Sequence, residues 1–168
     1  EYNGYNVDYS NKGTDQLARV VNTLKANPND RRMIVNSWNP NDLGKMALPP
    51  CHYGFQVTTI NDKLNLLWNQ RSVDTMLGLP FNIASYGLLL HLLAKETGLK
   101  EGKLTGFLAD VHIYKNHIEG AEEQLKRNSY KLPNIETENF SSIFEWECRQ
   151  SKIKDYKSHP KINFEIAV

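Results

Sequence analysis

The sequence contains few cysteines and no long hydrophobic run. Its 168 residues include two cysteines, Cys51 and Cys148, which neither form the framework of a disulfide-rich domain nor have the spacing of a zinc site. The longest apolar stretch, YGLLLHLLA, is about half of the roughly 18 residues that a membrane span requires. The polar start, EYNGYNVDYS, is unlike a signal peptide. We therefore expect a soluble cytoplasmic protein, in a reducing compartment, with no metal and no membrane partner.

An excess of charge of one sign is also missing. The chain has 20 basic and 19 acidic residues and a net charge of +1, which gives no reason to expect nucleic acid as a partner. Its length and its 40% hydrophobic content suffice for a real core. We expect one domain over residues 1–168.

Helices and strands are interspersed along the sequence. Apolar spacing predicts helices within 13–32 (ended by NPND), over 80–98 and over 115–128. Strands are expected at 31–39, 51–60, 62–74, 102–114 and 142–149, with a hairpin turn at IND, and the tail 157–168 should be extended. The helix that begins near Pro80 and ends at Gly98 is nearly all apolar. This order predicts the α+β class, a mixed β-sheet with a long buried helix against it.

One short segment, LPPCH, holds a cysteine rigidly. Pro49–Pro50 restricts the backbone before Cys51, as suits a nucleophile that must point in a fixed direction. Arg31 and Arg32 of DRR and Arg71 of QRS suit a phosphate, because guanidinium groups bind phosphate bidentately, and such cations also favour a thiolate. A buried structural cysteine and ordinary solvated arginines are the alternative interpretation.

Longer motifs narrow these alternatives. QRSVDTMLGLPFNIASY (70–86), together with LPPCH and DVHIYKNHIE, resembles the thymidylate synthase family in wording and order. The resemblance runs from DQLARVV to the final AV and corresponds to the C-terminal two-thirds of a family member. It implies a thymidylate synthase-like three-layer fold and a homodimer that methylates dUMP to dTMP with 5,10-methylenetetrahydrofolate as co-substrate.

The resemblance also assigns the residues around the nucleotide. Cys51 would add to C6 of the pyrimidine and make C5 nucleophilic toward the one-carbon unit. Arg71, helped by the Ser72 hydroxyl, would bind the phosphate, while Arg31 and Arg32 would reach the phosphate of the other subunit's nucleotide.

The base and the ribose have their own assignments. Asn82 would pair with O4 and N3–H of uracil, whereas an aspartate there would suit cytosine. His52 and Gln70 would order the nucleotide and its water network. His112 and Tyr114 would hold the ribose 3′-hydroxyl.

The folate side is assigned in the same way. Asp74 would hold the pterin, and Leu77, Gly78 and Phe81 would line the pocket. Val168 would supply a terminal carboxylate that closes over the ligands and keeps water away from the methylene intermediate.

Several residues also have purely structural interpretations. Asn82 suits a helix cap, Asp74 suits a turn, and His112 and Tyr114 suit packing on a strand. All tryptophans are expected in the core: Trp38, Trp68 and Trp146. His117 and His159 are expected at the surface or behind the site, and Cys148 has no recognisable role.

Departures from the family keep other functions open. The arginine, glutamate and tryptophans that the family supplies upstream are not recognised, so the family's N-terminal part is expected to be missing. Residues 107–109 read FLA where a double glycine is common, and the tail reads NFEIAV. The alternatives are a hydroxymethylase, in which water quenches the intermediate, and a nucleotide-binding remnant without turnover.

Overall fold

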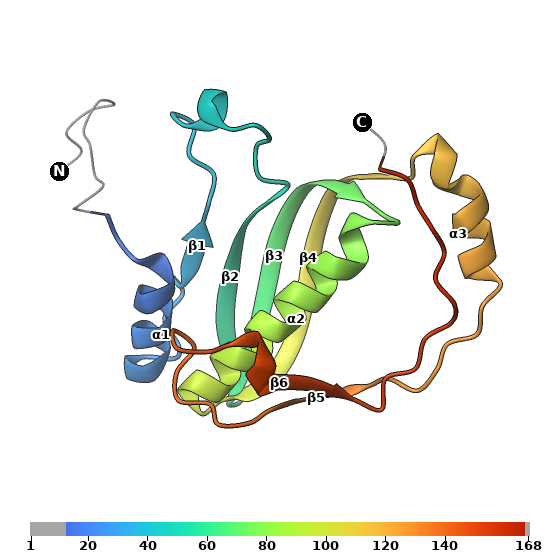
Figure 1. Cartoon of the computed structure of the whole chain (residues 1–168). Helices are drawn as coiled ribbons and strands as arrows, with labels where there is room; N and C mark the ends of the chain where they lie inside the picture. Colours follow the sequence, from blue (N-terminus) through green and yellow to red (C-terminus); the bar gives the residue numbers. More distant parts are fainter. Residues whose placement is uncertain (1–12, 167–168) are drawn as a thin grey trace. The chain divides into compact units, whose positions relative to one another are not determined.

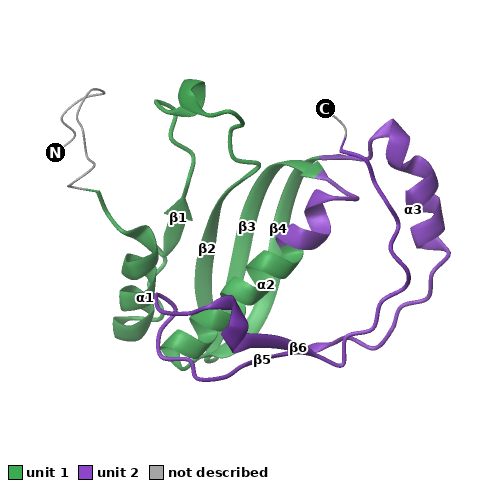
Figure 2. Cartoon of the chain, in the orientation of Figure 1, with its two compact units in different colours: residues 1–73, 83–110 green, residues 74–82, 111–168 purple. Residues whose placement is uncertain are grey.

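The computed structural model describes residues 13–166. The chain divides into two compact units, unit 1 with residues 1–73 and 83–110 and unit 2 with residues 74–82 and 111–168 (Figure 2). Helices and strands occur together with a mixed sheet, so the predicted α+β class is confirmed. Within residues 13–166, no helix combines the length and apolar character needed to cross a membrane.

A four-stranded sheet forms the centre of unit 1, in the order β1-β2-β3-β4 (Figure 1). Its strands are β1 (Ile34–Asn36), β2 (His52–Ile60), β3 (Lys63–Asp74) and β4 (Lys100–His112). β2 pairs antiparallel with β1 and with β3. The β2–β3 turn uses Asn61 and Asp62 with φ of 50° and 59°, values that a two-residue hairpin turn requires and that Asn and Asp tolerate. The predicted hairpin is confirmed, and β1 is shorter than expected.

Helix α1 (Gln16–Ala26) begins where the sequence supplies a cap. The Asp15 side chain accepts a hydrogen bond from the Ala18 N–H at 2.9 Å, which satisfies a donor that the first helical turn leaves open. Val20, Val21 and Leu24 bury the apolar face of the helix. The predicted end at NPND is confirmed.

Helix α2 (Gly78–Thr97) lies along one face of the sheet (Figure 1). Strand β3 points Leu64, Leu66 and Trp68 inward at alternate positions, and Trp68 stacks on Tyr86 of α2 at 5.2 Å between ring centroids. Such burial stabilises the fold by about 1.5–3 kcal/mol per large apolar side chain. Gly98, with φ of +69°, follows the helix as the sequence predicts.

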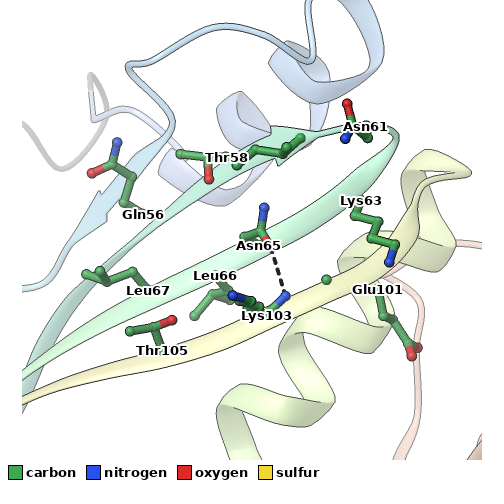
Figure 3. Close-up of a pocket in the computed structure, with 12 residues that line it drawn as sticks. Gln56, Thr58, Asn61, Lys63, Asn65, Leu66, Leu67, Glu101, Lys103 and Thr105 are labelled. Atoms are coloured by element: carbon green, nitrogen blue, oxygen red, sulfur yellow. Dashed lines mark hydrogen bonds between the residues drawn. The ribbon is translucent and has the colours of Figure 1, made fainter.

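The opposite face of this sheet is open. Ile34, Ile60, Leu67 and Phe107 lie on β1–β4 and remain between 39% and 63% exposed. A pocket on this face is lined by side chains that include Gln56, Thr58, Asn65, Leu67, Lys103 and Thr105. In it, Asn65 Oδ1 accepts a hydrogen bond from the Lys103 backbone N–H at 2.8 Å (Figure 3). None of the residues that line it belongs to the predicted site.

Unit 2 contains helix α3 (Ile118–Leu125) and a two-stranded sheet of β5 (Asn134–Thr137) and β6 (Ser151–Lys154). The strand predicted over 142–149 is wrong, because that segment consists of turns and the beginning of the 3₁₀ helix Cys148–Gln150. Glu136 pairs with Lys152 across the two strands, and its carboxylate lies 3.4 Å from Lys154 Nζ. Opposite charges thus lie next to each other on two backbone-paired strands that contain little apolar sequence.

Candidate active site

Cys51 is half-buried and precedes β2 directly. Its carbonyl oxygen accepts a hydrogen bond from the Arg71 backbone N–H at 2.8 Å. The Arg71 side chain donates from Nε to the Pro50 carbonyl at 3.0 Å and from Nη2 to the Pro49 carbonyl at 2.8 Å. Three hydrogen bonds from one residue therefore hold the segment that the two prolines were expected to stiffen.

Trp38 supports Arg71 from another direction. The Arg71 Cζ atom lies 5.7 Å from the centroid of the Trp38 ring, within the range of a cation–π contact. The Tyr53 ring meets Trp38 edge-on at 6.2 Å. The expected core position is confirmed for Trp68, which is 4% exposed, and is wrong for Trp38, which is half-buried.

His52 is oriented by helix α2. Its Nδ1 lies 3.0 Å from the Tyr86 hydroxyl, and the two rings meet edge-on. Burial raises the pKa of Tyr86, which keeps its hydroxyl protonated at neutral pH. This contact fixes the orientation of the imidazole ring.

Gln70 lies opposite His52 in the β2–β3 register and is only 2% exposed. Its Oε1 accepts a hydrogen bond from Trp68 Nε1 at 3.1 Å, and its Nε2 donates to the Ser72 carbonyl at 3.1 Å. These contacts fix which end of the Gln70 amide donates and which accepts. Ser72 itself is half-buried.

Arg31 and Arg32 are both exposed. Arg32 donates from Nη2 to Asp30 Oδ2 at 2.8 Å and from Nε to Asp30 Oδ1 at 3.2 Å. These hydrogen bonds lower the pKa of Asp30 to about 2. Because exposed ion pairs contribute little net free energy, a phosphate can compete with Asp30 for this guanidinium.

A second group of predicted residues belongs to unit 2. Asp74 Oδ1 accepts hydrogen bonds from the Met76 N–H at 3.0 Å and the Leu77 N–H at 3.2 Å, so the turn interpretation of Asp74 is confirmed. Helix α2 begins at Gly78 and Asn82 lies inside it, so the capping interpretation of Asn82 is wrong.

Aromatic side chains run through the same unit. The rings of His112 and Tyr114 meet edge-on at 5.1 Å, and those of Tyr114 and His117 at 5.6 Å. The His112 carbonyl accepts hydrogen bonds from Thr75 N at 3.1 Å and Thr75 Oγ1 at 2.8 Å. Phe81 is 73% exposed.

The other residues predicted on the folate side are Leu77, Gly78 and Val168. Leu77 and Gly78 are half-buried. Val168 lies outside the described residues, so its predicted role stays a prediction.

Sequence analysis missed the contacts of His117. This side chain is 0% exposed, which excludes the surface alternative for it, and the alternative position behind the site stays a prediction. Its Nε2 lies 2.6 Å from the Glu165 carbonyl, and its ring meets that of Phe164 at 5.0 Å. Among the described residues, its Nδ1 has no hydrogen-bond partner. The sequence signal for the contact of His117 with Tyr114 was their spacing of three residues, in the turn that precedes α3.

Unit 1 combines a half-buried thiol with an arginine that is bonded to the backbone of the same segment. Cys51 is accessible, its backbone is fixed, and Arg71 uses two of its five N–H groups on the proline carbonyls, which leaves three for an anion. Across residues 13–166, no group of three His, Cys, Asp or Glu side chains is arranged to hold a metal. These features are compatible with a protein class that uses a cysteine nucleophile together with an anion-binding arginine.

Comparison with known proteins gives the family. The family model described as Thymidylate synthase matches residues 2–168. The human protein "Thymidylate synthase" is 46% identical over 169 residues, which cover 100% of this chain and 54% of the human one. The Mycoplasma pneumoniae thymidylate synthase is 46% identical over 156 residues, covering 93% of this chain and 54% of the relative. The Paramecium tetraurelia bifunctional dihydrofolate reductase-thymidylate synthase is 43% identical over 100% of this chain and 36% of its own length.

The chain belongs to the thymidylate synthase family. It spans between about a third and about half of the length of these curated relatives.

Proposed function

We propose that the protein takes part in the reductive methylation of dUMP to dTMP. The observation that carries the proposal is the clamp of Arg71 on the segment that presents Cys51. In this mechanism the Cys51 sulfur would add to C6 of the pyrimidine, and C5 would attack the methylene carbon of 5,10-methylenetetrahydrofolate as one of its C–N bonds breaks. Loss of the C5 proton and of the second C–N bond would then be followed by hydride transfer from the tetrahydrofolate, which leaves as dihydrofolate, and by release of the Cys51 thiolate. The donors that Arg71 retains bind the nucleotide phosphate, together with the Ser72 hydroxyl.

The remaining nucleotide contacts are proposed for residues of both units. His52 and Gln70, each oriented by its hydrogen bonds, order the nucleotide and its water. In unit 2, Asn82 recognises uracil and the edge-on pair His112 and Tyr114 holds the ribose 3′-hydroxyl.

The folate contacts belong to unit 2. Asp74 uses Oδ1 for the turn before α2, which leaves Oδ2 to accept a hydrogen bond from the pterin. The exposed Phe81 ring supplies apolar surface beside Leu77 and Gly78 for the folate rings. Val168 closes over the ligands.

We also propose that the active unit is a homodimer. Exposed apolar side chains gather on the open face of the unit 1 sheet, as is typical of a protein interface, and include Ile34, Leu67 and Phe107. A second copy of the chain covers this face, and Arg31 and Arg32 reach the partner's nucleotide phosphate. Light scattering tests this directly, because Leu67→Lys on the face should shift the mass toward the monomer. A wild-type monomer would contradict the dimer.

The function is tested by mass spectrometry of the nucleotide after incubation of the chain with dUMP and 5,10-methylenetetrahydrofolate. A mass increase equal to one methyl group is expected. A hydroxymethyl product would instead identify the hydroxymethylase alternative, and an unchanged nucleotide that still binds would identify a remnant without turnover.

The two cysteines provide a matched pair of variants. Cys51→Ser should bind dUMP and lose turnover by orders of magnitude, because a hydroxyl is a far weaker nucleophile than a thiolate. Cys148→Ser should keep wild-type turnover, because Cys148 is exposed and is not among the residues proposed for the site. Normal turnover in Cys51→Ser would refute the covalent mechanism.

A further inference from the structure

A series of hydrogen bonds holds the segment that carries Trp38. Gln16 of α1 donates from Nε2 to the Asn36 carbonyl at 2.9 Å and accepts from the Asn36 N–H at 2.8 Å. The Asn36 side chain in turn accepts from the Trp38 N–H at 3.0 Å and donates to the Trp38 carbonyl at 3.3 Å. Both backbone polar groups of Trp38 are therefore fixed, although the residue lies just outside β1.

The same segment is tied to the strand that follows Cys51. Ser37 donates from its backbone N–H at 2.9 Å and from its hydroxyl at 3.1 Å to the Tyr53 carbonyl. Asn36, Trp38, Tyr53 and Arg71 line one pocket of unit 1. Trp38 and Arg71 thus line the same pocket and are also in cation–π contact with each other.

We propose that Trp38 is a positioning residue that acts on Cys51 and on the nucleotide phosphate through Arg71. This inference rests on the proposed function, since it assigns a partner to the phosphate-binding arginine. The Trp38 face restrains the plane of the guanidinium, so that Nε and Nη2 stay on the Pro50 and Pro49 carbonyls and the other donors face the phosphate. The family assignment gives Trp38 no role.

The physical argument is the flexibility of arginine. Ordering this long side chain costs rotamer entropy, and a contact on the guanidinium face adds a restraint to the two hydrogen bonds that already hold it. A cation–π contact adds about 0.5–2 kcal/mol and depends on the aromatic face rather than on apolar bulk. It also occupies no N–H group, so it does not compete with the proline carbonyls or with a phosphate.

Three variants separate this role from simple packing, all in a Cys148→Ser background in which Cys51 is the remaining thiol. Trp38→Phe keeps an aromatic face, Trp38→Leu keeps apolar bulk without one, and Trp146→Leu removes a half-buried tryptophan from unit 2. Two quantities are measured for each chain: the affinity for dUMP and for deoxyuridine, which lacks the phosphate, and the rate at which iodoacetamide alkylates Cys51.

Trp38→Leu should weaken dUMP binding by about 2- to 30-fold, the factor that corresponds to a lost cation–π contact. Its affinity for deoxyuridine should stay at the wild-type value, and alkylation of Cys51 should slow. Trp38→Phe should restore most of both losses, and Trp146→Leu should leave both quantities unchanged.

Several results would overturn the proposal. One is a Trp38→Leu chain whose dUMP affinity and Cys51 alkylation rate equal those of the wild type. Another is an equal loss of affinity for dUMP and for deoxyuridine in Trp38→Leu. A third is a loss of dUMP affinity in Trp38→Phe as large as that in Trp38→Leu. If the wild-type chain binds no dUMP, the proposed function fails. The role of Trp38 is then tested only by comparing the rates of Cys51 alkylation in Trp38→Leu and Trp38→Phe. Equal rates in those two variants would then refute it.

Discussion

Gly120 of α3 lies against the ring of Phe164, and Gly120→Ala tests how the C-terminal segment is attached within unit 2. A Cβ at this position would lie 2.4 Å from Phe164 Cε1, 2.8 Å from Phe164 Cζ and 3.0 Å from Ile162 Cγ2. These distances are shorter than normal carbon contacts, so the ring must move. Phe164 also packs on His117, whose Nε2 is bonded to the next carbonyl along the chain.

Two opposing effects set the magnitude. Alanine is favoured over glycine inside a helix by about 1 kcal/mol, whereas overpacking costs about 1–3 kcal/mol. Residues 157–166 form no helix or strand, so the clash with Phe164 is most easily relieved by a movement of this segment. That movement also breaks the hydrogen bond between His117 and Glu165, which contributes about 1 kcal/mol. The expected net loss is about 1–2 kcal/mol, which lowers the melting temperature by about 2–4 °C per kcal/mol.

Hydrogen exchange followed by mass spectrometry locates this effect. Amides of residues 157–166 should exchange faster in Gly120→Ala, while those of the unit 1 sheet should stay as protected as in the wild type. Gly44→Ala is the matched control, because a Cβ at Gly44 meets nothing within 4 Å. A more stable Gly120→Ala chain with wild-type exchange in its tail would refute the reasoning, since helix propensity would then be the only effect.

Three further substitutions have defined outcomes. Burial raises the pKa of Tyr86 above 10.0 in the folded protein. Its neutral phenol therefore stabilises the fold below pH 10.0, and this contribution is lost as the pH rises through the pKa of the folded state. Tyr86→Phe should reduce the fall in the denaturation midpoint at alkaline pH. Hydrogen bonds from Arg32 lower the pKa of Asp30 from 3.8 to about 2. The ionised carboxylate therefore stabilises the fold above pH 3.8, and this contribution is lost as the pH falls through about 2. Asp30→Asn should remove this fall in the denaturation midpoint at acid pH. Asn82→Asp should shift nucleotide preference from dUMP toward dCMP in competition binding, and an unchanged preference would remove Asn82 from its proposed role.

Local signals predicted the elements that have strong apolar patterns. The hairpin was predictable because β-branched and aromatic residues surround a turn of Asn61 and Asp62, whose φ values suit those residue types. Helix α2 was predictable from its apolar content and from Gly98 at its end. Strands β5 and β6 were not, because each has a single isoleucine, Ile135 or Ile153, and their other residues give no apolar pattern. Their ion pairs exist only once the strands have paired.

For the candidate site, the sequence proposes residues, and the structure adds contacts that no motif indicated. Motifs single out Cys51 and Arg71 as candidates, because covalent chemistry and phosphate binding would require such side chains. No pattern indicated that Arg71 would bond the proline carbonyls or face Trp38, since these contacts join segments that are distant in sequence. Trp38 was expected in the core because tryptophans usually lie there, and its position beside β1 overrode that tendency.

The functions assigned to Arg71 are compatible only because they use different parts of one guanidinium. Nε and one Nη2 hydrogen face the carbonyls before Cys51, and the π face meets Trp38 without using a donor. Nη1 and the second Nη2 hydrogen then remain for a phosphate. A lysine, with one compact ammonium group and no planar face, cannot hold two carbonyls, stack on an indole and bind a phosphate together. In the proposed mechanism, arginine at this position would therefore link the rigidity of the Cys51 segment to the binding of the phosphate.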